Sequence, residues 1–314
     1  MRFRRPAPIV LSALAMLAAI GAVILIALLS GVSLHRTFAH VHAGWFAVVA
    51  IAEGASLIPY TLAYRKMTAM AGPRPPRLRV LITVVMSGFG PFLLGGGFHL
   101  DQKVLTEVYG DHQQARVGVA ALVALEWAVL SPAACASAIV LLIEGAGVMQ
   151  SLLWPWALLV PAGFTLGLIL SAPKHGLTVN RLPVLAGALE GIGTIHQLIR
   201  SPGRTSPAWA GMALYWAAEI VAVDGALHMF GVDLSPLRVI LAYATGYMVT
   251  RRSLPLAGAI FTEVLLTFAL HWVGAPLGPA LAAVVVYRLF NLILAAVPSF
   301  LARRLLEPAI AAEL

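Results

Sequence analysis

Two stretches of this 314-residue chain have nearly the same order of residues, Leu78-Arg79-Val80-Leu81-Ile82 and Leu237-Arg238-Val239-Ile240-Leu241. Each stretch leads into an apolar segment that is broken by glycine or proline and holds one acidic residue, Asp101 or Glu263. Two broken apolar copies in one chain are typical of secondary transporters, which are built from internal repeats. Chance similarity between segments rich in Ala, Leu and Val is the alternative explanation.

The composition indicates a membrane protein, because 60% of the residues are hydrophobic and only 11% are charged, against about 25% charged in soluble domains. Apolar runs at 9–30, 44–64, 115–143, 154–171, 208–230 and 278–302 approach or exceed the ~20 helical residues that span a bilayer. The first run is too long for a cleaved signal peptide and is expected to remain as an anchor. We therefore predict an all-α polytopic membrane protein with about eight transmembrane helices plus re-entrant or broken half-helices.

The net charge of +8 is explained by topology rather than by nucleic acid, because no basic motif with interleaved aromatic residues occurs. Basic residues cluster between alternate spans: Arg2, Arg4 and Arg5; Arg65, Lys66, Arg74, Arg77 and Arg79; Lys174, Arg181, Arg200 and Arg204; Arg303 and Arg304. The positive-inside rule then places both termini on the cytoplasmic side of the cell (inner) membrane.

The chain is expected to be one transmembrane domain, 1–314. Its predicted parts are a two-helix unit at 1–77, repeat one at 78–143, connecting helices at 144–234 with an amphipathic interfacial helix at 182–199, repeat two at 235–302 and a cytoplasmic tail at 303–314. Segments 80–98 and 237–250 have the features of half-helices, which membranes tolerate only where protein or a watery cavity satisfies the backbone. Repeat one begins inside and repeat two outside, so the repeats are predicted to be inverted.

Charged residues inside the spans are the candidate functional residues, because an unpaired charge at the bilayer centre costs at least ~2.5–3.5 kcal/mol. If the second broken segment enters from outside, Arg251 and Arg252 lie near its tip and their planar guanidiniums suit a lipid phosphate. Alternatively, the two arginines mark a cytoplasmic loop after a short complete span.

Two further pairs of residues occupy matching places in the repeats, each 162 positions apart (101 to 263 and 126 to 288). Asp101 and Glu263 follow the glycine breaks and are predicted to bind a cationic headgroup or a proton, with a helix N-terminal cap as the alternative. Glu126 and Arg288 are predicted to form a structural ion pair between the repeats. Glu53, Glu219 and Asp224 also fall within spans.

Several short motifs resemble the flippase-like transmembrane region of the lysylphosphatidylglycerol synthase family. They are Ala63-Tyr64-Arg65, Leu94-Gly95-Gly96-Gly97 with Asp101 and Lys103, Leu125-Glu126, Leu254-Pro255 with Gly258 and Glu263, Gly274-Ala275-Pro276 and Val286-Tyr287-Arg288-Leu289. The family usually has a fuller Pro-Gly-Gly-x-Gly-x-x-Glu motif in the second repeat, of which this chain has only part. The resemblance implies a stand-alone member without the aminoacyl-transferase domain.

The resemblance also implies a lipid flippase, whose substrate is an aminoacyl-phospholipid or a polyprenyl-phosphate-linked sugar. We find no nucleophile, nucleotide-binding or metal-binding motif, so a transporter is favoured over an enzyme, with no cofactor and no metal. The expected partners are a membrane lipid and a lipid-modifying enzyme. Two alternatives remain: a membrane-embedded transferase acting on a lipid-linked substrate, and a non-transporting scaffold for a lipid-modifying enzyme.

Overall fold

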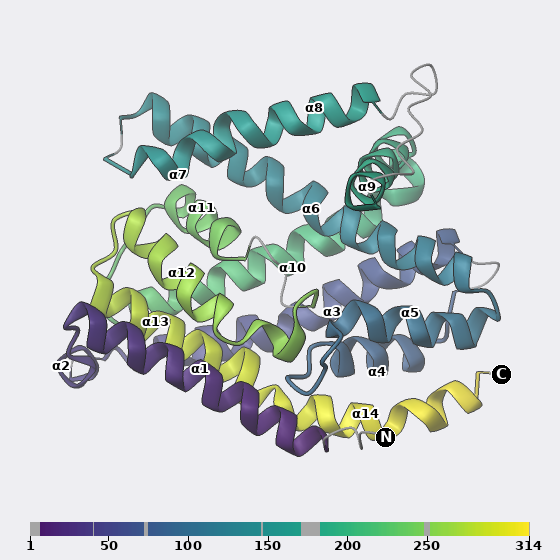
Figure 1. Ribbon diagram of the computed structural model, residues 1–314, viewed down its shortest axis with the longest axis horizontal. Coiled ribbons are helices and arrows are strands. Elements are labelled where there is room, and N and C mark those ends of the chain that lie inside the picture. Colours follow the sequence, from purple (N-terminus) through teal and green to yellow (C-terminus); the bar gives the residue numbers. More distant parts are fainter. Residues whose placement is uncertain are drawn as a thin grey trace.

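The computed structural model describes residues 7–39, 41–71, 75–145, 147–170, 183–247 and 252–313; the side chains of residues 71, 170, 183–190 and 202 are not described. These residues form helices and contain no β-strand (Figure 1). Seven of the described helices are long and apolar enough to cross a membrane. The chain is therefore an all-α, multi-pass membrane protein, as predicted. Outside the described residues lie Arg2, Arg4, Arg5, Arg74, Lys174, Arg181 and Arg251.

The sequence predicted about eight spans plus broken half-helices, and the two broken segments differ in length. The segment Pro255–Trp272 is long enough to count among the seven, whereas α4 (Leu78–Gly88) has only 11 residues. At 1.5 Å per residue, such a helix covers about half of a hydrocarbon core. Both segments are nevertheless arms of hairpins, described below.

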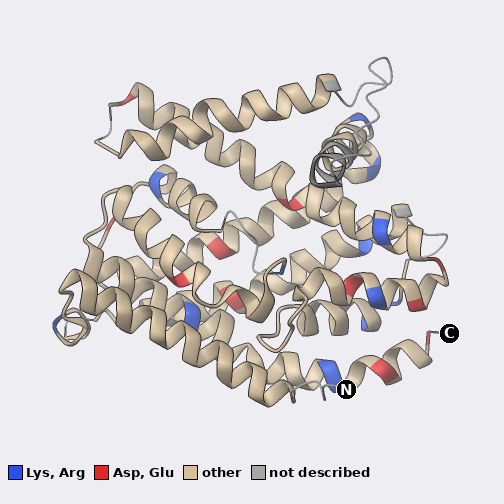
Figure 2. Ribbon diagram, in the orientation of Figure 1, with Lys and Arg blue, Asp and Glu red and all other residues tan. Residues whose placement is uncertain are grey.

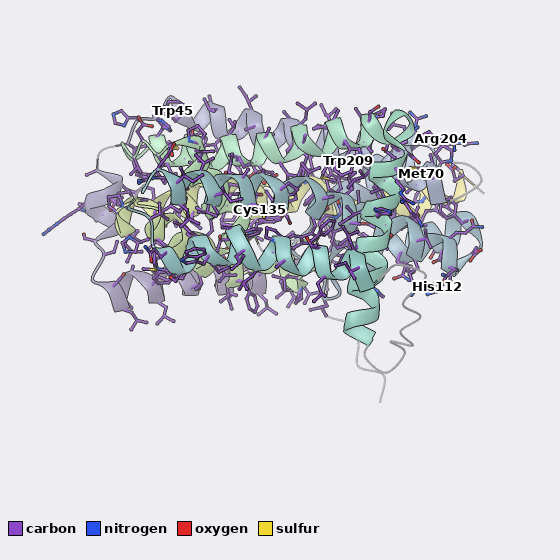
Figure 3. All side chains as sticks on the ribbon, turned by 90° about the horizontal axis from the view of Figure 1, so that it is seen from above. Trp45, Met70, His112, Cys135, Arg204 and Trp209 are labelled. Carbon is purple, nitrogen blue, oxygen red and sulfur yellow. The ribbon has the colours of Figure 1, made fainter. Side chains whose placement is uncertain are left out.

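Two long helices, α3 (Trp45–Ala71) and α10 (Pro202–His228), pack along each other at the centre of the molecule. They run in opposite directions, since Figure 3 shows Met70 and Arg204 at one end and Trp45 at the other. On the periphery, α1 (Pro8–Ser30) and the short α2 (Leu34–Phe38) precede α3. Each of the two central helices leads into one hairpin.

The first hairpin consists of α4 and α5 (Gly96–Tyr109), and α6 (His112–Ile143) follows it across the molecule. Gly110 ends α5 with a φ of 67°, a conformation that glycine adopts without strain. The returning arm therefore extends to Tyr109, and the hairpin is longer than the predicted 80–98, which covers only the first arm, the tip and the start of α5.

The second hairpin consists of α11 (Pro236–Gly246), the 3₁₀ turn η4 (Pro255–Gly258) and α12 (Phe261–Trp272). Then α13 (Leu277–Arg288), the π-helical η5 (Leu289–Leu294) and α14 (Ala296–Ala311) follow. The first arms, α4 and α11, both have 11 residues and both end in glycine. Because α14 continues to Ala311, most of the predicted tail, 303–314, belongs to the last helix.

The two hairpins enter from opposite ends of the molecule (Figure 1): α4 begins at the end that holds the two termini, and α11 begins at the other end. We call α6 the closing helix of the first half and the continuous segment α13–η5–α14 the closing helix of the second half. The first arm of each hairpin packs against the closing helix of the other half, α4 on α14 and α11 on α6. This is the inverted arrangement that the sequence predicted.

The helices between the two halves form a separate layer. The span made of α7 (Gln150–Trp154), the π-helical η1 (Pro155–Leu159) and α8 (Val160–Leu170) packs beside α6. Beyond it, α9 (Pro183–Arg200) lies across the direction of the long helices (Figure 3), close to the predicted bounds 182–199. A helix across the end of a bundle is typical of an interfacial helix.

Lys and Arg residues gather toward the end of the molecule that holds the two termini (Figure 2). This distribution agrees with the alternating basic clusters in the sequence. The assignment of that end to the cytoplasm rests on the positive-inside rule and stays a prediction.

Candidate functional site

The tips of the two hairpins touch at the centre of the molecule. Gly97 and Phe98, at the start of α5, donate backbone hydrogen bonds to the Arg252 carbonyl oxygen at 2.7 and 3.3 Å. In return, the Leu256 N–H of the second tip donates to the Leu93 carbonyl oxygen of the first at 2.9 Å. The N-terminus of α5 is thus capped by the backbone of the opposite hairpin, and each tip donates to a backbone carbonyl of the other.

Glycines make this approach possible. A Cβ atom on Gly88 would lie 2.6 Å from Arg252 Nη2, and one on Gly97 would overlap the Gly88 carbonyl oxygen. Gly96 has a φ of +74° and its Cβ would lie 2.5 Å from the Arg252 carbonyl oxygen. The glycine run that the sequence showed as a helix break therefore has a packing role: it makes room for the second hairpin.

Arg252 reaches across the contact between the tips and forms an ion pair with Asp101 on α5. Its Nη2 atom lies 2.6 and 2.5 Å from the two carboxylate oxygens of Asp101. Both residues are buried, with exposed fractions of 1% and 0%. The sequence predicted that these two residues act at separate points of a substrate path, but in the structure they bind each other. The Arg252 guanidinium, which was predicted to bind a phosphate, binds the Asp101 carboxylate.

Aromatic rings enclose this ion pair. The Arg252 Cζ atom lies 4.7 Å from the ring centroid of Phe89, 5.1 Å from that of Tyr60 and 5.4 Å from that of Phe98, distances at which a cation is attracted to a ring face. The Arg252 Nε atom is buried without a hydrogen-bond partner among the described residues. The guanidinium thus keeps one unused donor.

A second buried ion pair lies in the second half. The Arg288 Nε atom donates to Glu263 Oε1 at 2.6 Å, Nη1 donates to Asn291 Oδ1 at 3.0 Å, and Nη2 donates to the Ala257 carbonyl oxygen at 3.3 Å. Glu263 and Arg288 are 1% and 3% exposed. This pair ties α13 to the returning arm α12 of the same half.

The prediction that Glu126 pairs with Arg288 is wrong. Arg288 is bound by Glu263, and Glu126 instead accepts a hydrogen bond from the Tyr60 hydroxyl at 2.7 Å. The two residues were matched only by the constant offset in the sequence. Matching positions in inverted repeats need not touch, and Arg288 binds a carboxylate on the neighbouring helix α12.

Glu219 on α10 is, after Glu126, a second buried acidic residue that accepts hydrogen bonds from tyrosine. Its Oε2 atom accepts hydrogen bonds from Tyr287 at 2.6 Å and from Tyr243 at 3.2 Å. Sequence reasoning placed Glu219 inside a span but did not find these partners or the Tyr60 bond to Glu126. The only available signal was that a carboxylate buried in a span requires a donor.

A cavity of about 200 Å³ adjoins the tips between α3, α4, α10 and the segment η5–α14. Glu53 and Glu219 line it, and Phe89 separates it from Arg252. Its lining is mainly apolar, with Glu53, Glu219 and two serines as the polar side chains. The central polar cavity that the broken hairpins predicted therefore stays a prediction.

No protein family, curated protein or solved structure matches the chain. The family resemblance therefore stays a prediction, and any function is argued from the geometry.

Proposed function

We propose that this protein moves a lipid with a polar, phosphate-bearing headgroup between the two leaflets of the bacterial inner membrane, with both termini in the cytoplasm. The supporting observation is the contact between two broken hairpins that enter from opposite ends and meet around a buried ion pair. Inverted halves of this kind exchange outward-open and inward-open states through one packing scheme. The contact between the tips is the closed gate in this scheme.

Arg252 is the proposed phosphate-binding residue. In the closed structure its Nη2 atom donates to both oxygens of Asp101, and the same guanidinium can donate to the oxygens of a phosphate. When the tips separate, a lipid phosphate replaces Asp101, and the released carboxylate attracts a cationic part of the headgroup or a proton. In the other half, Glu263 has one oxygen, Oε2, without a hydrogen-bond partner among the described residues, and it lines the second part of the path.

The test is translocation of a fluorescent phospholipid in proteoliposomes. Leu93→Cys and Leu256→Cys, placed where the two tips share a backbone hydrogen bond, are combined with Cys135→Ala to remove the only native cysteine. Oxidation should slow translocation at least tenfold by holding the tips together, and a reductant should restore it.

The two single-cysteine variants, treated in the same way, are the matched controls. A second comparison sets Arg252→Gln, which should abolish translocation, against Arg77→Gln, which removes an exposed guanidinium at the membrane surface. Unchanged translocation by the crosslinked protein would disprove the gate. Failure of the unmodified protein to move any phosphate lipid would disprove the function, and covalent turnover of the lipid would favour the transferase.

A further inference from the structure

A large apolar groove lies on the side of α6 away from the ion pairs. It has a volume of about 860 Å³ and is bounded by α6, α8, α9 and the start of α10. Its wall on α6 includes Ala124, Trp127, Ala128 and Cys135. Glu126, on the same helix, is bonded to Tyr60 in the core instead. The groove is thus separated from the proposed path by α6.

Small residues on the walls leave space beside the helices unfilled. Ala120, Ala124, Ala128 and Ala136 on α6 face the groove, and Gly191 lies on α9. Ser131 is the only wall residue with a hydroxyl among the described residues that line the groove. Larger side chains, among them Trp127 on α6 and Phe164 on α8, line the groove but leave this volume open.

A void of this size needs an occupant. Protein interiors are packed as densely as organic crystals, and this groove equals roughly 30 water molecules at ~30 Å³ each. Water is a poor occupant, because apolar cavities stay dry and a water molecule needs two to four polar partners. The neighbouring span exposes Leu158 and Leu159 on η1 and Leu166 on α8, so the groove lies at the depth of the hydrocarbon core.

We propose that the groove holds a hydrocarbon chain of a resident phospholipid, which packs between α6, α8 and α9 and is not the transported lipid. The chain supplies the apolar contacts that the small wall residues leave open. The amphipathic α9 forms one wall of the groove and lies across the direction of the long helices (Figure 3), as a helix at the membrane surface does. This inference requires only a membrane-embedded chain and does not depend on the proposed lipid transport.

The single native cysteine is the reporter, because Cys135 lies on the groove wall and is the only thiol in the protein. In purified protein, we expect extensive detergent washing to speed reaction of Cys135 with N-ethylmaleimide at least tenfold. Added phosphatidylglycerol should reverse the effect. A reaction rate that is independent of lipid would overturn the proposal.

A filling variant tests the same site by native mass spectrometry. Ala128→Phe places a ring in the groove and should abolish retention of a phospholipid, whereas the matched control Ala13→Phe, on the exposed face of α1, should retain it. Equal retention by both variants would overturn the proposal. If Ala128→Phe fails to fold, dodecyl methanethiosulfonate attached to Cys135 of the folded protein supplies the filling chain instead.

The same modified protein identifies the source of the chain. A resident lipid predicts that the dodecyl group displaces the retained phospholipid but leaves translocation within about twofold of the unmodified rate. If the modified protein loses translocation while Ala13→Phe translocates normally, the groove holds the chain of the transported lipid. This result would overturn the proposal that the groove holds a resident phospholipid.

Discussion

The two buried ion pairs are built from equivalent acidic residues but join different parts of the molecule. Asp101 on α5 binds Arg252, which comes from the tip of the opposite hairpin. Glu263 on α12 binds Arg288, which lies on the closing helix of the same half. The first pair therefore holds the two halves together, whereas the second holds one half in shape. The two carboxylates match in the repeat pattern of the sequence, yet they bind arginines from different parts of the molecule.

This difference assigns the pairs different parts in a transport cycle. An ion pair between the halves must break when the hairpins separate, and its two charges then become available to a headgroup. An ion pair within one half can persist through the cycle. Arg288 also has two further acceptors, Asn291 and the Ala257 carbonyl, as a permanent structural residue requires.

The largest expected effects come from removing each carboxylate. Asp101→Asn leaves the Arg252 charge buried, and it should lower the free energy of unfolding by about 3–5 kcal/mol. Glu263→Gln should have a smaller effect because Arg288 keeps two acceptors. Thermal unfolding in detergent measures the stability of both variants. The control is Arg77→Gln, which breaks an exposed ion pair with Glu313 and should change the free energy of unfolding by about 0–1 kcal/mol.

The rate of disulfide formation between Leu93→Cys and Leu256→Cys distinguishes the two roles. Asp101→Asn should slow this reaction because the tips separate more often, while Glu263→Gln should leave it unchanged. Equal slowing by both variants would contradict the distinction between a pair that joins the halves and a pair inside one half.

Tyrosine hydroxyls give the second comparison between the halves. Tyr60→Phe removes the side-chain donor of Glu126 and should lower the free energy of unfolding by about 1–3 kcal/mol. Tyr287→Phe should have a smaller effect, since Glu219 keeps its bond from Tyr243. Tyr64→Phe is the control, because the buried Tyr64 hydroxyl has no hydrogen-bond partner among the described residues. A loss of stability in the control equal to that of Tyr60→Phe would refute the role of the hydroxyl bond.

The sequence predicted the two hairpins because glycine breaks and chain length are local properties. The interrupted run from Gly88 to Gly97 cannot form one continuous span, and the alternating basic clusters determine from which side each hairpin enters. The sequence also matched Asp101 with Glu263, because these two residues are separated by the same number of positions as Glu126 and Arg288. These features need no knowledge of which helices touch.

The partners of the charged residues could not be predicted in the same way. Arg252 lies 151 positions from Asp101 and Tyr60 lies 66 positions from Glu126, and no repeat or helical spacing links either pair. A constant offset shows that Glu126 and Arg288 are equivalent, but equivalence in inverted halves does not mean contact. Only the packing of α4 on α14 and of α11 on α6 brings the tips together.

The smallest expected effect on stability comes from the N-terminus of α6, which differs from the N-terminus of α13. Asp111 caps α6 by accepting hydrogen bonds from the backbone N–H groups of Gln113 and Gln114 at 2.8 and 3.3 Å, whereas α13 begins after Pro276 without a side-chain cap. Asp111→Ala should lower the free energy of unfolding by about 1 kcal/mol and speed hydrogen exchange at these two amides. Asp111→Asn should behave like the unmodified protein, because asparagine caps a helix about as well as aspartate. If the Asn and Ala variants exchange equally fast, the negative charge of Asp111 acting on the helix dipole, rather than the cap, stabilises this end of α6.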